Sequence, residues 1–124
     1  MTAKVHGIGG VFFRSPNPAA LRDWYRTWLG VEATGEGGAF FTPDAMLPGG
    51  GTVWAPFPQA TKYFGDSGQH FMINMVVDDV RQALEQVRQG GATVIEKLDE
   101  HDYGIFGWFV DPDGNRVELW QPKG

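Results

Sequence analysis

The chain has 124 residues and a mass of 13.7 kDa, which suits one domain with a single hydrophobic core. Ten Lys and Arg against 15 Asp and Glu give a net charge of −5, so phosphate repulsion argues against a nucleic acid partner. The lack of cysteine excludes disulfides and thiolate sites. The sequence contains no run of about 18 apolar residues, so we expect no membrane-spanning helix. No secretory signal pattern is present, so we expect a cytoplasmic protein.

The first half predicts a strand, a helix and further short strands. Asn17 is a good N-cap, Pro18 suits the first helical position, and Gly30 suits a helix end. Apolar residues between them recur at helical spacing. The expected elements are a strand at 8–14, a helix at 18–29, short strands within 31–42 and at 52–55, and a long loop at 56–69.

The second half predicts the same order of elements. Asp78 and Asp79 are expected to cap a helix, and Gly90-Gly91 ends it. Pro and Gly within residues 111–115 favour a tight turn between two strands. His101 falls in a segment expected as an exposed loop. The expected elements are a strand at 71–77, a helix at 80–89, and strands at 92–98, 105–110 and 116–120.

The two halves together predict an α+β fold of two βαβββ units within a single domain, residues 1–124. A shift of about 62 residues aligns the caps Asn17 and Asp79, which places the units at about 5–60 and 69–122. Two such units form a curved mixed sheet with helices on one face and a concave cleft on the other. A cleft of this kind is a natural small-molecule site.

Strand alternation predicts which side chains line the cleft. Val117 and Leu119 are expected to face the helices, which turns their neighbours toward the cleft. Tyr63 and Phe64 in the long loop are candidates to close over a ligand, and a loop without a role is the alternative. Aromatic residues on this face either stack on a planar ligand or pack in a core or dimer contact. The candidate ligand-binding residues are Phe12, Arg14, Trp54, Met72, Asn74, Trp108, Arg116 and Trp120, with Glu118 as the candidate catalytic residue.

Three segments resemble the vicinal oxygen chelate superfamily, which includes glyoxalase I, bleomycin-resistance proteins and extradiol dioxygenases. Residues 111–120, Asp-Pro-Asp-Gly-Asn-Arg-Val-Glu-Leu-Trp, resemble its closing hairpin. Residues 17–30 resemble its first helix, which commonly ends in Leu-Gly, and Tyr103-Gly104 fits before the hairpin. The resemblance spans nearly the whole chain and implies the two-unit fold and a homodimer. It does not select a reaction.

The resemblance also implies a divalent metal held by one ligand from each of four strands. Those positions fall here on Gly10, Met72, Trp54 or Ala55, and Glu118. Three of these four positions lack a side chain that binds such a cation well, so we expect no metal cofactor. If a metal is bound nonetheless, the fallback ligands are His6, His70 and Glu118.

Three functions remain open at this point. The first is a binding protein like the bleomycin-resistance branch, which holds an aromatic or cationic compound in the cleft. The second is an enzyme, a glyoxalase-like lyase or isomerase or a dioxygenase-type protein, that uses Glu118 with or without metal. The third is a protein–protein module with a vestigial groove. Arg14 binds a ligand anion or pairs within the protein, and Asn74 orients a ligand carbonyl or bonds within the sheet.

Overall fold

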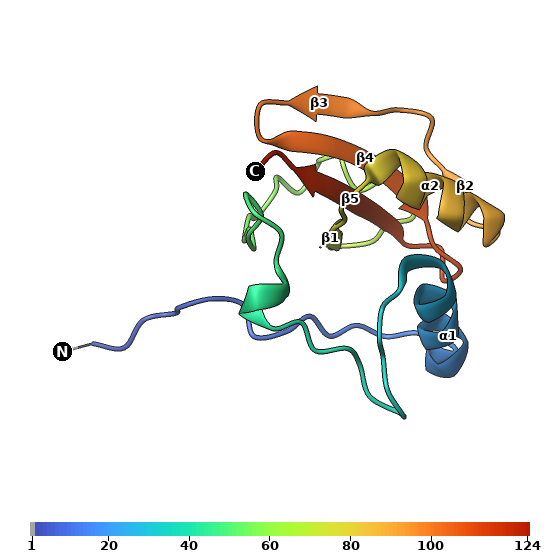
Figure 1. Ribbon diagram of the computed structural model, residues 1–124, viewed down its shortest axis with the longest axis horizontal. Helices are drawn as coiled ribbons and strands as arrows, with labels where there is room; N and C mark the ends of the chain where they lie inside the picture. Colours follow the sequence, from blue (N-terminus) through green and yellow to red (C-terminus); the bar gives the residue numbers. More distant parts are fainter. Residues whose placement is uncertain (1) are drawn as a thin grey trace.

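All five strands come from the second half of the chain in the computed structural model, which describes residues 2–124. Helix α2 packs on one face of a mixed sheet, and α1 lies beside α2 (Figure 1). The fold is therefore α+β, as predicted. The elements are α1 (Pro18–Leu29), the short 3-10 helix η1 (Pro43–Ala45), β1 (Asn74–Val76), α2 (Val80–Gln89), β2 (Thr93–Val94), β3 (Asp99–His101), β4 (Gly104–Val110) and β5 (Arg116–Pro122).

The sheet has the strand order β1-β5-β4-β2, and β3 also pairs with β4. Strand β1 runs parallel to β5, and the other pairs are antiparallel. In this register Asn74 and Trp108 both lie opposite Glu118, one on each side. Because directly opposed residues share a face of the sheet, these three side chains form one row across three strands. We call Asn74, Glu118 and Trp108 the Glu118 row.

The hairpin that joins β4 to β5 is confirmed, and the side chain of Asp111 organises it. Its Oδ1 accepts hydrogen bonds of 3.0 Å from the backbone N–H groups of Asp113 and Asn115. Gly114 takes a φ of 85°, which favours glycine. The Tyr25 hydroxyl of α1 donates to Asp111 Oδ2 at 2.8 Å. This buried bond ties the first helix to the hairpin.

Both helices begin where the caps predict. The Asn17 side chain accepts from the Ala20 N–H at 3.1 Å, and Gly30 ends α1 in the left-handed region at φ 65°. The Asp79 side chain accepts from the Gln82 N–H at 2.9 Å at the start of α2. Across residues 2–124, no helix is long and apolar enough to cross a membrane.

The core lies between the two helices and one face of the sheet. Val117 and Leu119 of β5 are 2% and 0% exposed on that face, so the predicted alternation of β5 is confirmed. Phe109 of β4 is also fully buried there. Burial of one such side chain contributes about 1.5–3 kcal/mol. The buried cluster consists of Leu21, Tyr25, Val80, Ala83, Leu84, Val87, Ile105, Phe109, Val117 and Leu119.

The strands expected in the first half are not formed: residues 2–73 of the structure contain none. Figure 1 shows the N-terminal segment extended away from the sheet. Phe12, Phe40 and Trp54, which lie in the expected strands, are 94%, 86% and 76% exposed. A strand needs a neighbour for its backbone groups, and these segments have none within the described chain. The structure thus contains one strand–helix–strand unit and not the expected pair.

The expected loop at His101 is corrected as well. His101 lies in β3, opposite Gly104 of β4, and its ring stacks on Tyr103 at a centroid distance of 5.1 Å. The predicted strand at 92–98 is correspondingly shorter, because only Thr93–Val94 pairs with β4. Strand β3 was not predicted because it contains charged residues such as Asp99 and Glu100, and an exposed edge strand lacks the apolar pattern by which a strand is recognised.

Candidate ligand-binding site

Glu118 lies at the centre of the sheet face opposite α2, which we call the cleft face. It is 7% exposed and accepts hydrogen bonds from three neutral groups. Asn74 Nδ2 donates to its Oε1 at 2.7 Å, and Trp108 Nε1 donates to its Oε2 at 3.0 Å. The Tyr63 hydroxyl donates to Oε2 as well. Strands β1, β4 and β5 therefore fix this carboxyl group from both sides, and the long loop caps it.

The loop of residues 56–69 places a cluster of aromatic rings over the Glu118 row. The ring of Tyr63 meets Trp108 edge-on at 6.0 Å and stacks on Phe57 at 5.5 Å. Phe57 also contacts Phe64 at 5.1 Å. Tyr63 and Phe64 were predicted as a cover, but the bond to Glu118 and the part played by Phe57 were not. The dense aromatic content of the loop was the available signal.

The environment of Tyr63 keeps its hydroxyl a hydrogen-bond donor. Burial raises the pKa of the Tyr63 phenol well above its ordinary value, and the bond to Glu118 raises it further. The phenol therefore remains protonated at neutral pH and continues to donate to the carboxyl group.

Two cations flank the buried indole of Trp108. The guanidinium carbon of Arg116 lies 5.6 Å from the ring centre, and Lys97 Nζ lies 5.8 Å from it. Lys97 was not among the predicted residues. Trp108 itself is 1% exposed, so of the two expected alternatives, ligand stacking and packing in the core, the structure shows a packed ring that also donates to Glu118.

Trp120 lies farther along the same face and belongs to a separate aromatic group. Its ring lies parallel to that of Phe106 at 5.9 Å, and its Nε1 donates to the Tyr103 carbonyl at 3.0 Å. Gly104 leaves room for it, because a Cβ there would lie 2.3 Å from Trp120 Nε1. Trp120 is therefore positioned beside the Glu118 row and is not hydrogen-bonded to it.

The remaining predicted residues are not gathered at this site. Phe12, Arg14 and Trp54 are exposed in segments that add no strand to the sheet. Met72 is half-buried just before β1. The structure thus unites Asn74, Trp108, Arg116 and Glu118 from the predicted set, all of them from the second half. Phe12, Arg14 and Trp54 depended on strands that the first half does not form, and Met72 lies outside β1 because this strand begins only at Asn74.

The residues present do not fit the divalent metal that the resemblance implies. Within residues 2–124, no three His, Asp or Glu side chains come together in a way that could hold an ion. His6 and His70 are exposed, so the fallback trio with Glu118 is not assembled in the described chain. The side chains nearest the Glu118 carboxyl group are hydrogen-bond donors, which present hydrogens where a metal would need lone pairs.

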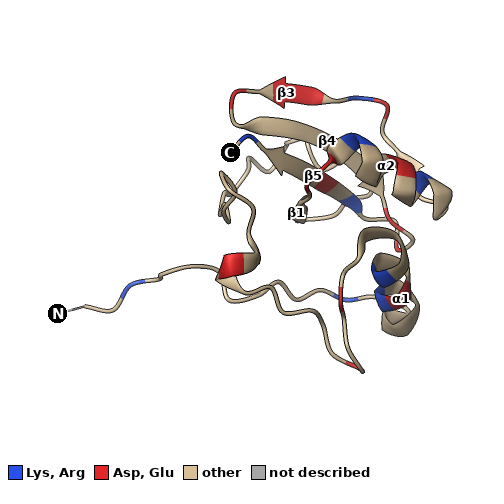
Figure 2. Cartoon of the chain, in the orientation of Figure 1, with Lys and Arg blue, Asp and Glu red and all other residues tan. Residues whose placement is uncertain are grey.

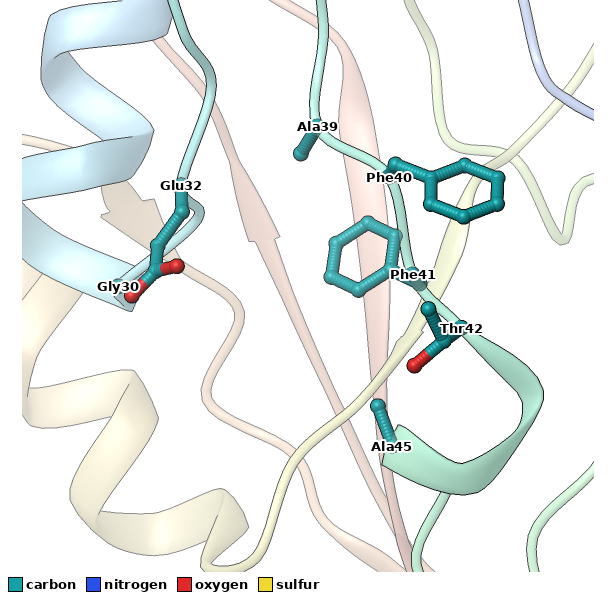
Figure 3. Close-up of a pocket in the computed structure, with 7 residues that line it drawn as sticks. All are labelled: Gly30, Glu32, Ala39, Phe40, Phe41, Thr42 and Ala45. Atoms are coloured by element: carbon teal, nitrogen blue, oxygen red, sulfur yellow. The ribbon is translucent and has the colours of Figure 1, made fainter.

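The described part of the chain contains two cavities of similar volume. One of about 250 Å³ lies between the end of α1 and residues 39–45, and Figure 3 shows Phe41 turned toward Glu32 and Phe40 turned away. None of the residues of the Glu118 row lines it. The second, of about 240 Å³, is bordered by Arg116 and by loop residues 64–67. The second cavity therefore belongs to the cleft face.

The fold and this face define the class of protein: an α+β protein with a mixed sheet and a buried carboxyl group on the sheet face opposite α2. A family model described as "Glyoxalase-like domain" matches residues 10–120. The chain belongs to this glyoxalase-like family, which confirms the resemblance seen in the sequence. The match includes residues 10–73, which form no strand in the structure.

The chain is also similar to several solved structures, and the first of these shows the same fold. A protein from the mobile metagenome of V. pseudocholerae is 20% identical over 97% of both chains, with a TM-score of 0.57. A member of the glyoxalase/bleomycin resistance protein/dioxygenase superfamily from Sphaerobacter thermophilus is 24% identical over 97% and 98% of the chains, with a TM-score of 0.49. TnmS3, an antibiotic-binding protein from Streptomyces sp., is 17% identical over 88% and 89%, also at 0.49. A match to UcmS2 spans only 39% of this chain and 37% of that one. No curated protein sequence matches the chain.

Proposed function

We propose that this protein binds a small aromatic molecule on the cleft face, with Glu118 as its polar anchor. The observation that carries the proposal is the position of Tyr63. Its ring lies edge-on to Trp108 and its hydroxyl donates to Glu118, so the loop itself supplies an aromatic ring with a hydrogen-bond donor. A ligand of the same shape, including an aromatic cation, would replace Tyr63 when the loop opens.

The Glu118 row suits such recognition because it is already organised. Asn74 and Trp108 hold the carboxyl group in one orientation, so a ligand does not have to order it on binding. Aromatic side chains supply apolar contact, and a single polar group selects the ligand's orientation. The loss of one hydrogen-bond donor from the ligand should therefore weaken binding.

Indole and N-methylindole form a matched pair of probes, because they differ in the N–H group. We expect indole to raise the melting temperature more than N-methylindole, since the indole N–H can take the place of the Tyr63 hydroxyl on Glu118. The variant Glu118→Gln should reduce this difference. A matched control is Trp54→Phe, which alters an exposed ring away from the sheet. No stabilisation by either probe would contradict the proposal, and equal stabilisation would remove Glu118 from it.

A second candidate is catalysis by Glu118 as general base, in a lyase or isomerase reaction of the glyoxalase type. The observation that favours it is the direct contact between a phenol and a carboxyl group in one covered site. The test is Glu118→Gln, which should abolish turnover at nearly unchanged melting temperature. The fold can tolerate the added amide because Asn74 can rotate its own amide to accept from it. Retained turnover would exclude Glu118 as the base.

We also propose that the chain forms a homodimer in which the first half completes the second strand–helix unit. The support is two largely apolar and exposed stretches of the first half: residues 5–13 and 45–61 contain no Lys, Arg, Asp or Glu (Figure 2). Exposed apolar stretches of this kind are typical of interaction surfaces. Sedimentation should give the mass of two chains. A monomer at all concentrations would contradict the proposal.

A further inference from the structure

Arg116 is a cation on the cleft face that no carboxylate of residues 2–124 neutralises by direct contact. The five ion pairs in that part of the chain involve Arg26, Arg88, Lys97 and Lys123 instead. No hydrogen bond joins the Arg116 guanidinium to the described residues, and its Nε is buried without a partner. A buried donor without an acceptor costs free energy. The position therefore favours an acceptor supplied from outside the chain.

The side chain of Gln69 fixes the backbone of Arg116. The Arg116 N–H donates to Gln69 Oε1 at 2.7 Å, and Gln69 Nε2 donates to the Arg116 carbonyl at 3.0 Å. These two bonds take the place of the backbone hydrogen bonds that a neighbouring strand would form at the start of β5. The face of Trp108 supports the guanidinium on one side. The cation is thus held in place by groups that leave its own nitrogens without acceptors.

The cavity of about 240 Å³ lies against this guanidinium. Its walls are mostly apolar and include Phe64, Ile95 and Val110. Gly65 keeps the cavity open, because a Cβ there would lie 3.0 Å from Arg116 Cδ and 3.6 Å from its Nη1. The φ of Gly65 is also 84°, which strains any other residue. The space is therefore large enough for a small planar group and is bordered by one free guanidinium.

The acidic residues nearby do not occupy this cation. Glu118 lies two positions along β5 on the same face, but its oxygens already accept from Asn74, Trp108 and Tyr63. Asp66 lines the cavity and is exposed, and it forms no ion pair with Arg116 within 4.0 Å. The guanidinium of Arg116 is therefore neutralised neither by Glu118 nor by Asp66, and it can receive a negative group from a ligand.

We infer that Arg116 and loop residues 64–67 form a subsite for the carboxylate of an aromatic acid. The fork of a guanidinium matches the two oxygens of a carboxylate, and a planar, singly charged group suits an apolar cavity. The inference rests on the proposed function, because the aromatic part of the acid would occupy the place of Tyr63. It adds the ligand's charge, which the Glu118 row alone does not specify.

Benzoate, benzamide and benzylammonium are matched probes for this subsite. They share one ring and carry a negative, a neutral and a positive group. We expect benzoate to bind about tenfold more tightly than benzamide by calorimetry, because charged hydrogen bonds exceed neutral ones by this order. Arg116→Gln should remove the preference, and Arg116→Lys should retain only part of it. Asp66→Asn should strengthen benzoate binding by removing a competing charge.

Arg81→Gln is the charge-matched control, because Arg81 is exposed on α2, on the other side of the sheet. It should leave the preference for benzoate intact, and circular dichroism verifies that each variant folds. Equal binding of benzoate and benzamide would overturn the subsite alone. The same conclusion would follow if Arg81→Gln and Arg116→Gln reduced the preference for benzoate equally. If none of the three probes binds and indole also fails, the proposed function falls together with the subsite.

Discussion

The two halves of this chain contain similar strand-like sequences and have very different structures. In the second half, Phe109 and Leu119 are fully buried in a paired sheet under α2. In the first half, Phe12 and Trp54 are 94% and 76% exposed in segments without strand partners. An apolar alternating segment is therefore only a potential strand, and a neighbouring backbone decides whether the strand forms.

The same contrast extends to the candidate site. Asn74, Trp108, Arg116 and Glu118 come from the paired half, whose register places them on one face. The first half contributes α1 and the aromatic loop, which contacts that face through Tyr63. A rigid row under an aromatic loop is an arrangement in which a ligand can exchange with a side chain of the protein.

The largest expected effect comes from the same truncation made once in each half. Phe109→Ala should cost about 3–5 kcal/mol of unfolding free energy, because it leaves a cavity in the core. Phe12→Ala should change the stability of the monomer by about 0.5 kcal/mol at most, since the ring is exposed. Urea unfolding at a concentration where the chain is monomeric measures both. Equal costs would show that the first half is packed as tightly as the second.

Tyr25→Phe tests the bond between α1 and the hairpin. It removes a buried hydrogen bond to a carboxylate, so we expect a loss of about 1.5–3 kcal/mol. Tyr103→Phe is the matched control, because Tyr103 is 60% exposed and its hydroxyl has no partner among the described residues. A Tyr25→Phe protein as stable as the control would mean that α1 is not fastened through Asp111.

The burial of the Asp111 carboxyl group predicts that the stability of the fold depends on pH. Burial raises the pKa of Asp111 above its unfolded value, although the bonds from Tyr25 and the turn lower it in part. The folded state therefore holds this proton more tightly, and stability falls as pH rises from the unfolded pKa, about 4, through the folded one. Asp111→Asn should flatten the acid side of a plot of melting temperature against pH. An unchanged slope would contradict this assignment.

A smaller effect is expected where the loop meets the sheet. Tyr63→Phe keeps the ring and removes one bond to Glu118, which should cost about 0.5–1.5 kcal/mol, toward the lower end because Tyr63 is 38% exposed. The raised pKa of Tyr63 also predicts that stability declines as pH rises above about 10, and the variant should lack that part of the decline. Melting curves between neutral and alkaline pH measure both. A variant with the wild-type alkaline decline would contradict the contact.

The smallest effect is expected at the exposed pair of Lys123 and Glu100, whose atoms lie 3.0 Å apart. Lys123 lowers the pKa of Glu100, first through its hydrogen bond and then through its charge. The stabilisation from this pair is present above the pKa that Glu100 has in the unfolded chain, and it is lost as the pH falls through the lower pKa of Glu100 in the folded protein. Lys123→Ala should raise the pKa of Glu100 in an NMR titration without a resolvable change in melting temperature. A clear fall in melting temperature would show that the C-terminal end of β5 depends on this pair.

Local chemistry explains what the sequence could predict. The caps Asn17 and Asp79 and the turn at residues 111–115 depend on atoms a few residues apart, and all three are confirmed. The alternation of β5 also placed Glu118 on the cleft face correctly. Alternation along a strand predicts which face of the sheet a side chain occupies, but it does not predict which side chains form hydrogen bonds with it there.

Long-range contacts explain what the sequence could not predict. The bond from Tyr63 to Glu118 joins residues 55 positions apart, and that from Tyr25 to Asp111 joins residues 86 apart. The burial of Trp108, whose ring meets Tyr63 of the loop edge-on, likewise depends on a contact between residues far apart in the chain. The first-half strands were expected from composition, and their pairing depends on a neighbour that the described chain does not provide.

The most direct test of the account follows the tryptophan indole N–H signals by NMR during a titration with indole. The chain has five tryptophans, and Trp54→Phe and Trp108→Phe assign the two decisive signals. The account predicts that the Trp108 signal moves as the ligand displaces Tyr63 from Glu118, and that the exposed Trp54 signal stays in place. A shift confined to Trp54, or no shift at Trp108 at saturating indole, would contradict binding on the cleft face.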